Sequence, residues 1–374
     1  MKTIQSRHQL VAALTVSAVL LATGGIAQNL FYVTLWGDYF PGNGTLIKVD
    51  LGTMSQTTVQ TGLYIPSGVT FFPNGNVCFA DTGNGTLYQV SPSGATTPFL
   101  TGLNYPSNPC FTPWNTCVVP QFGAQCYTEF NLDGTVVNTI TGTTFGGFDG
   151  PVSARWAAYD WSNYYGYYDA NAEAAYEANY QAYAASRGHS PGRVDVLKHN
   201  PDGTWTQEQP LATNLNYAYD AVPDQAGNVF VSEEGNGRIL KFPVAADGTV
   251  STNPVVFAKG LSPVGLAFDR AGSLYEADLG GVINKFLFSN GTLSTNPVAV
   301  VTNLSAPAYL AFPPPPIVGI SRAGGSVVLR WADALYALQS AAVLTGTFTN
   351  VQGATSPYTN ATTGGARFFR LKSL

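Results

Sequence analysis

Two oxygen-bearing side chains occupy matching positions in a series of short apolar segments. When the first segments of successive repeats are aligned, Asn108 and Asp220 fall in one column, and Asp149, just before a Gly-Pro pair, can add a third oxygen. Amide and carboxylate oxygens suit calcium and other hard divalent cations. The sequence therefore predicts candidate ligand-binding residues at Asn108, Asp149 and Asp220, with Asn108 and Asp220 as metal ligands. The alternative is that these residues cap strand ends and bind water.

Four further carboxylates recur where the second segment of a repeat ends, namely Asp81, Glu233, Glu234 and Asp278. Recurrence at equivalent places favours a turn role, in which each carboxylate accepts hydrogen bonds from backbone N–H groups. Among the three histidines, only His189 is a candidate base, and no Ser/His/Asp triad can be assembled. We therefore assign no catalytic residue.

The chain contains four cysteines. Cys110 and Cys117 lie on neighbouring antiparallel strands of one expected sheet, so a Cys110–Cys117 disulfide is our preferred prediction for an exported chain. Buried thiols are the alternative, and the spacings do not resemble a zinc site.

An aromatic and alanine-rich segment interrupts the pattern at about residues 156–192. Residues 169–186 read DANAEAAYEANYQAYAAS, and their alanines and helically spaced tyrosines predict a helix. The segment either forms a lid or carbohydrate-stacking face over a ligand, or packs onto the edge of the fold. The candidate lid residues are Trp156, Trp161, Tyr176, Tyr180 and Tyr183.

The elements that position these residues are repeats. A Gly-Leu or Asn-Leu pair ends each unit, and the pairs begin at Gly62, Gly102, Asn214, Gly260 and Asn303, with a weaker one at Gly142. Apart from one interval that contains the insertion, the spacing is 40 to 46 residues. A period near 40 with four short strands per unit is typical of a β-propeller blade.

The two ends of the repeat region complement each other. Residues 29–33 form a second strand with no first strand before it, and residues 308–312 form a first strand with no partner after it. Pairing them closes the ring and removes a free sheet edge. We therefore predict an all-β fold: a six-bladed β-propeller over residues 28–312, closed by N- and C-terminal strands and carrying the helical insertion.

Outside the repeats, residues 1–27 combine two basic residues, an uncharged apolar run and a small-residue end, which predicts a signal peptide. Residues 313–316 are a proline linker, and residues 317–374 are expected to form a small β-sandwich-like module. We expect a secreted, periplasmic or cell-surface monomer with no membrane span after signal removal. Only 17 scattered basic residues argue against nucleic acid as a partner.

The segment Pro263–Phe286, PVGLAFDRAGSLYEADLGGVINKF, and its looser copies at 66–90 and 219–242 resemble the NHL and SMP-30/gluconolactonase-like six-bladed propellers. This resemblance covers residues 29–312 and implies that fold. Lactonase-type members hold a divalent cation over the channel with a Glu, an Asn and an Asp. This chain departs from them, because it has no matching Glu in its first blade and its polar residues lie one column away.

The last residues, with VVLRWADALYALQSA and GARFFRL, resemble the fibronectin III-like C-terminal modules of secreted bacterial proteins. The sequence favours a secreted binding or scaffold propeller with a small-molecule or carbohydrate ligand. The alternative is a lactonase-like hydrolase that uses calcium or another divalent cation at the channel. Propellers host many activities, so the fold does not decide between these functions.

Overall fold

The computed structural model describes residues 29–112, 114–141, 151–156, 181–186, 192–200, 202–314, 319–323, 326–330, 336–343, 347–361 and 367–373. The chain divides into two compact units, whose described residues run from 29 to 314 and from 319 to 373. Helical structure in the described ranges is confined to the 3₁₀ turns η1 (Thr82–Asn84) and η2 (Glu234–Asn236). The prediction of an all-β chain is confirmed.

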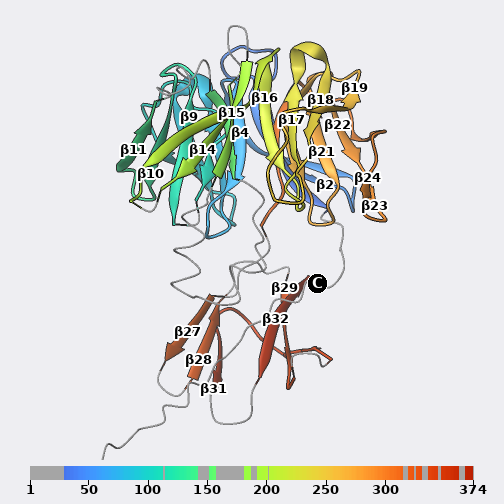
Figure 1. Ribbon diagram of the computed structural model, residues 1–374. Helices are drawn as coiled ribbons and strands as arrows, with labels where there is room; N and C mark the ends of the chain where they lie inside the picture. Colours follow the sequence, from blue (N-terminus) through green and yellow to red (C-terminus); the bar gives the residue numbers. More distant parts are fainter. Residues whose placement is uncertain are drawn as a thin grey trace, which may run out of the picture. The chain divides into compact units, whose positions relative to one another are not determined.

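The first unit contains six four-stranded antiparallel sheets (Figure 1). In spatial order, sheet 1 is β26 (Pro307–Ala311), β1 (Leu30–Leu35), β2 (Gly44–Asp50) and β3 (Ser55–Leu63). Sheet 2 is β4 (Pro66–Phe71), β5 (Val77–Asp81), β6 (Thr86–Val90) and β7 (Thr96–Leu100). Sheet 3 is β8 (Cys110–Phe111), β9 (Thr116–Gln121), β10 (Cys126–Asn131) and β11 (Val136–Ile140).

Sheet 4 is β12 (Pro151–Trp156), β13 (Gln181–Ser186), β14 (Gly192–His199) and β15 (Trp205–Leu215). Sheet 5 is β16 (Ala218–Pro223), β17 (Val229–Glu233), β18 (Arg238–Phe242) and β19 (Val255–Lys259). Sheet 6 is β20 (Pro263–Phe268), β21 (Leu274–Asp278), β22 (Val282–Phe286) and β25 (Val298–Val301), next to the small hairpin of β23 (Phe288–Ser289) and β24 (Thr292–Leu293).

The predicted pairing between the two ends of the repeat region is confirmed. Strand β26 pairs antiparallel with β1, with Val33 opposite Leu310 and Leu35 opposite Pro307. The first strands of the six sheets also contact one another in cyclic order, from β26 through β4, β8, β12, β16 and β20 back to β26. Six first strands therefore surround a common centre.

The repeat marker has a physical basis in backbone conformation. The Gly or Asn of each described marker pair has a positive φ, between 60° at Asn214 and 78° at Gly260. Glycine reaches this region without steric cost, and asparagine tolerates it better than most residues. The sequence therefore repeats Gly or Asn because each unit turns through the left-handed region before the next first strand.

Apolar clusters fill the spaces between neighbouring sheets. Phe31 of sheet 1 packs against Tyr275 of sheet 6, and Tyr127 of sheet 3 shares a buried cluster with Leu197 of sheet 4. Burial of large side chains on both faces explains why the strands are nearly continuous apolar runs rather than strictly alternating ones. The sheets stand face to face and position their strand ends around the centre.

The predicted helix over residues 169–186 is wrong in its last third. Residues 181–186 form strand β13, which pairs with β12 on one side, where Tyr183 is opposite Arg155, and with β14 on the other, where Tyr183 is opposite Val196. Backbone hydrogen bonds along both edges outweigh the helical preference of the alanines, which is a weak and context-dependent tendency. The insertion therefore supplies the second strand of sheet 4.

The second unit contains two three-stranded antiparallel sheets. One is β27 (Gly319–Ala323), β28 (Ser326–Arg330) and β31 (Tyr358–Ala361), and the other is β30 (Thr349–Asn350), β29 (Tyr336–Ala341) and β32 (Phe368–Ser373). Buried Leu329 of the first sheet and Leu338 and Phe369 of the second belong to one apolar cluster. The described residues of this region are thus mainly strands, and the β-sandwich-like module stays a prediction.

Candidate functional site: a pocket shared by six sheets

A cavity of about 440 Å3, which we call the central pocket, lies where the six sheets meet. Each sheet contributes at least one of its lining residues, and sheet 4 contributes Val152. Six of the lining residues are aromatic: Trp36, Tyr39, Tyr105, Phe122, Tyr219 and Tyr309. A volume of this size and a mainly apolar lining are typical of small-molecule sites.

The repeat geometry explains which positions reach the central pocket. The residue directly after the second strand lines it in five sheets, and these residues are Trp36, Thr82, Phe122, Glu234 and Leu279. Residues near the start of the first strand line it as well, among them Ser67, Ser107 and Tyr219. Because strands of successive repeats end at the same side of the ring, one pair of repeat positions supplies most of the wall.

The carboxylates before these positions hold the strand ends in place. Asp81 Oδ1, Glu233 Oε1 and Asp278 Oδ2 each accept the backbone N–H of a residue one or two positions before the first strand of the same sheet, at 2.8 Å. In sheet 3, Gln121 Oε1 accepts the N–H of Asn104 at the same distance. The predicted turn role is confirmed for Asp81, Glu233 and Asp278.

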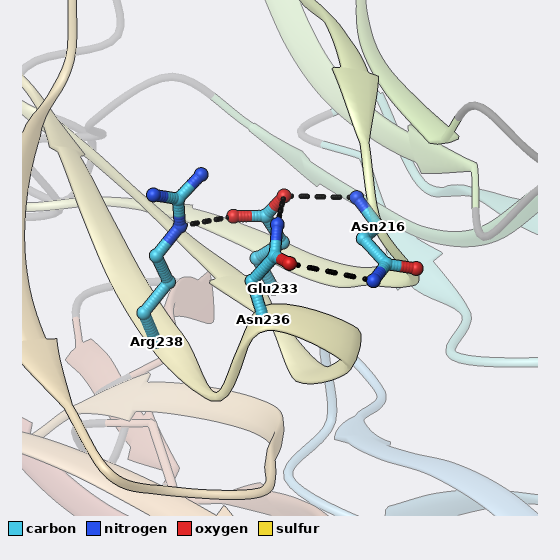
Figure 2. A network of polar contacts seen from close by, with 4 residues as sticks. All are labelled: Asn216, Glu233, Asn236 and Arg238. Atoms are coloured by element: carbon cyan, nitrogen blue, oxygen red, sulfur yellow. Dashed lines mark hydrogen bonds and ion pairs between the residues drawn. The ribbon is translucent and has the colours of Figure 1, made fainter.

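Figure 2 shows the fullest of these arrangements, in sheet 5. The buried Glu233 carboxylate accepts hydrogen bonds from Asn216 N, from Asn236 Nδ2 at 2.7 Å and from Arg238 Nε. Its charge is therefore balanced by a guanidinium and two N–H donors. Glu234, the next residue, has no such role, because it lines the central pocket.

The aromatic wall of the central pocket is held by hydrogen bonds. Trp36 Nε1 donates to Ser67 Oγ at 2.8 Å, and Ser67 Oγ donates to the carbonyl of Ile65 at 3.1 Å. The Trp36 ring lies 5.5 Å from that of Tyr39 and 6.0 Å from that of Tyr219, centroid to centroid. These bonds fix the indole orientation, so the pocket is preformed.

Backbone strain is concentrated at the rim. Ile65 and Tyr105 both line the central pocket and both have a φ of 49°. Such a value is a conformational outlier for a β-branched residue and costs on the order of 1–3 kcal/mol. The same repeat position is left-handed at Tyr217 and Ala306, so the strain belongs to the turn that aims these side chains at the centre.

The predicted residue Asn108 follows Ser107, which lines the central pocket, but is not itself a lining residue. It is fully buried, and neither its amide oxygen nor its amide nitrogen has a hydrogen-bond partner. Its backbone N–H donates to the carbonyl of Val152 at 3.1 Å, and a Cβ added to Gly68 would lie 2.4 Å from the Asn108 Cα. The neighbouring residue, Ser107, is the one that lines the pocket.

The predicted residue Asp220 is also fully buried, but its carboxylate binds backbone. The N–H groups of Ala221 and Leu266 donate to Oδ1 and Oδ2 at 3.1 Å each, and the bond from Leu266 ties β16 to β20. Both oxygens are therefore occupied by amides. Asn108 contacts sheets 2 and 4.

These surroundings do not fit the divalent cation that the family resemblance implies. A calcium site needs six to eight oxygen ligands directed at one point. The Asp220 oxygens point at N–H donors, and the described residues contain no group of three His, Cys, Asp or Glu side chains with ligating geometry. We derive no chemical step through a metal ion.

The remaining candidates fall partly outside the described residues. Asp149, Trp161, Tyr176 and Tyr180 lie there. Trp156 is the last residue of β12, whereas Val152, near the start of that strand, is the one that reaches the central pocket. Four residues of extended strand span roughly 13 Å. Trp156 therefore lies further along sheet 4 than Val152, and its role as a lid stays a prediction.

The cysteines are thiols, so the structure does not contain the predicted Cys110–Cys117 disulfide. The strand register explains this, because Cys110 is opposite Val118 and Cys117 is opposite Phe111. Cys78 and Cys117 share the buried cluster between sheets 2 and 3. Burial raises the pKa of both thiols, which keeps them protonated and apolar in character.

A second hollow, of about 600 Å3, lies between sheets 5 and 6. Its lining includes four phenylalanines, and its one carboxylate, Asp224, accepts hydrogen bonds from Ala226 and Asn228 of its own turn. Only two sheets line this hollow, and its charged groups have partners. It is larger than the central pocket but has fewer features that would select a ligand.

Two buried glutamates outside the pocket were not singled out by sequence reasoning. Glu129 accepts hydrogen bonds from four side chains of sheets 3 and 4, and Glu276 accepts one, from Asn284 Nδ2 at 2.9 Å. No local signal distinguishes them from other strand glutamates. Their partners come from sequence separations of up to 76 residues, so only the fold reveals them.

Comparisons with solved structures agree with the fold. The chain is similar to a gluconolactonase from Xanthomonas campestris, with a TM-score of 0.52 and 12% identity over 80% of this chain and 94% of that one. A chain of the nidogen/laminin complex matches with a TM-score of 0.54 and 11% identity over 75% and 97%. A protein from Lactobacillus plantarum matches with a TM-score of 0.50 and 13% identity over 76% and 99%.

No protein-family model matches the sequence, and no curated protein matches it. Identities this low show the fold alone, and that fold is a β-propeller. No helix in the part of the chain that the structure describes is long and apolar enough to cross a membrane.

Proposed function

We propose that this protein is an exported six-bladed β-propeller that binds a small-molecule or carbohydrate ligand in the central pocket. The observation that carries the proposal is that all six sheets contribute to one preformed pocket with six aromatic side chains. Aromatic rings provide large contact areas with little loss of side-chain entropy on binding. The N-terminal segment 1–27 supports export, and the six sheets with their end-to-end pairing support the blade count.

The lactonase-like alternative has weaker support. It rests on a fold shared with a gluconolactonase, and folds of this kind host unrelated activities. A metal-dependent mechanism would also require Asp220 to exchange two backbone N–H bonds for a cation. We expect that addition of calcium or a chelator leaves the thermal midpoint of the protein unchanged, whereas a metal-dependent enzyme would be destabilised by the chelator.

A matched pair of variants tests the binding proposal. Tyr105 and Tyr217 occupy the same repeat position with φ values of 49° and 54°, but only Tyr105 lines the central pocket. A library of small molecules and oligosaccharides is screened by thermal shift on the wild type. For the hits, Tyr105→Leu should weaken the affinity about tenfold, and Tyr217→Leu should leave it unchanged.

Both tyrosines are 39–50% exposed, so the two substitutions should have similar, small effects on folding. Hits that bind both variants as tightly as the wild type would show that the ligand binds elsewhere. The absence of any hit would favour a scaffold without a small ligand.

A further inference from the structure

We propose that the central pocket selects an organic cation, that is, an ammonium or guanidinium group attached to an apolar or planar body. This inference rests on the proposed binding function and names the ligand class. Its starting point is Glu234, the only charged residue among the described lining residues.

Glu234 is not required by the repeat. The equivalent lining positions in four other sheets are Trp36, Thr82, Phe122 and Leu279, none of which is charged. The preceding position, by contrast, is a hydrogen-bond acceptor in four of these five sheets, the exception being Leu35 of sheet 1, as expected of a residue with a structural role. A residue that the fold requires would recur at the equivalent position of the other sheets. The carboxylate of Glu234 therefore serves ligand binding and not the stability of the fold.

Glu234 also lacks a side-chain partner among the described residues. Its neighbour Glu233 binds Arg238 and two N–H donors, and Asp81 and Asp278 each accept two hydrogen bonds. The Glu234 carboxylate makes no hydrogen bond and no ion pair with the part of the chain that the structure describes. The lining likewise includes no lysine, arginine or histidine there. The pocket thus presents one uncompensated negative charge.

The aromatic side chains of the central pocket also favour a positively charged ligand. The faces of Trp and Tyr rings carry negative charge density and attract cations within about 6 Å of the ring centroid. Trp36 lies between Tyr39 and Tyr219, and its indole N–H is directed at Ser67 rather than into the pocket. An anionic ligand would meet a carboxylate and ring faces with no cation to balance it, so anions are excluded.

The test compares two probes of the same shape that differ in charge. Choline and 3,3-dimethylbutan-1-ol, its neutral isostere, are titrated against the full chain by calorimetry, followed by a series of aryltrimethylammonium ions. We expect the cations to bind at least tenfold more tightly than neutral isosteres. Glu234→Gln should reduce this preference to less than threefold, and Asp247→Asn, which removes a carboxylate from an exposed turn, should preserve it.

Tyr39→Leu adds a readout for the ring face, since Tyr39 is 49% exposed and its loss should not impair folding. Weaker cation binding in this variant, with unchanged binding of neutral isosteres, supports the proposal. Equal binding of both probe types, a preference that persists in Glu234→Gln, or no binding of any cation in the series would overturn it. If neutral or anionic ligands bind with sensitivity to Tyr105→Leu, the binding function stands and the cation selectivity falls.

Discussion

Glu129 and Glu276 are both almost completely buried glutamates on strands of the propeller, yet their surroundings differ in the number of hydrogen-bond donors. Glu129 lies between sheets 3 and 4 and accepts bonds from Trp114, Thr116, Asn138 and Trp205 at 2.6–2.9 Å. Glu276 in sheet 6 accepts one bond, from Asn284, and its Oε1 has no partner.

These surroundings shift the pKa values of the two glutamates in opposite directions. Burial alone raises the pKa of a carboxyl group. At Glu129 this effect is outweighed by the four donors, so the pKa lies below its usual value and the group is charged. At Glu276 burial dominates, the charge of Asp278 adds to it and the single Asn284 bond opposes it, and the pKa rises to about 8. Burial by itself therefore does not determine whether an interior acid is ionised.

The largest effect is expected from Glu129→Gln. The substitution removes the charge and places an NH2 group among donors, which leaves Trp or Asn N–H groups buried without an acceptor. The free energy of unfolding should fall by about 3–5 kcal/mol, as for other buried groups that lose their partners. Urea denaturation at pH 7 measures the change.

Glu234→Gln serves as the control, because Glu234 has no donors in the described part of the chain, and it should change stability by less than about 0.5 kcal/mol.

The pH dependence gives a second check. Glu129 has a depressed pKa in the folded state, so its stabilisation is present above the unfolded value and is lost as the pH falls. Equal acid sensitivity of wild type and Glu129→Gln would contradict the charged state of Glu129.

A change of opposite sign is expected from Glu276→Gln. The folded pKa of about 8 exceeds the unfolded value, so the wild type loses stability as the pH rises from about 4.5 towards 8. The slope is at most about 1.4 kcal/mol per pH unit. Glutamine stays neutral, so the variant should be more stable than the wild type by about 2–3 kcal/mol at pH 7.

Denaturation curves at pH 5, 6, 7 and 8 test this prediction. The difference between Glu276→Gln and wild type should grow with each step in pH. A constant difference would mean that Glu276 does not titrate in this range.

The smallest effects come from removing one donor at each site. Asn138→Leu withdraws one bond from a charged carboxylate and should cost about 2 kcal/mol, whereas Asn284→Leu withdraws a bond from a neutral acid and should cost about 1 kcal/mol at pH 6. Asn284→Leu should also raise the pKa of Glu276, because the hydrogen bond from Asn284 lowers it. Similar costs at pH 6 would indicate that the two glutamates have the same charge.

Much of the fold was accessible from sequence, because its signals are local. The left-handed turns require Gly or Asn at each marker, and both the period and the strand bounds of residues 263–301 follow from them. The insertion shows where local signals fail. Residues 181–186 have helical composition, but they adopt a strand because β12 and β14 offer edges on both sides.

The candidate site was predicted one residue away from its place. Column alignment directed attention to Asn108 and Asp220, whereas the residues that face the central pocket are Ser107 and Tyr219. Adjacent residues of a strand point to opposite sides. A shift of one residue in the alignment of the repeats therefore exchanges the residues that line the central pocket for residues that are buried behind them. The polar character of Asn108 and Asp220 suggested function, but Asp220 uses its carboxylate to join two sheets.

The sequence by itself determined the repeat and its strand order, because both depend on short-range turn and strand preferences, and the incomplete units at the two ends indicated their pairing. Only the tertiary structure decided which side chains share the centre, because Trp36, Tyr219 and Glu234 are brought together by ring closure. The same holds for ionisation. The charge of Glu129 depends on donors from two sheets, and such long-range hydrogen bonds leave no pattern in a single sequence.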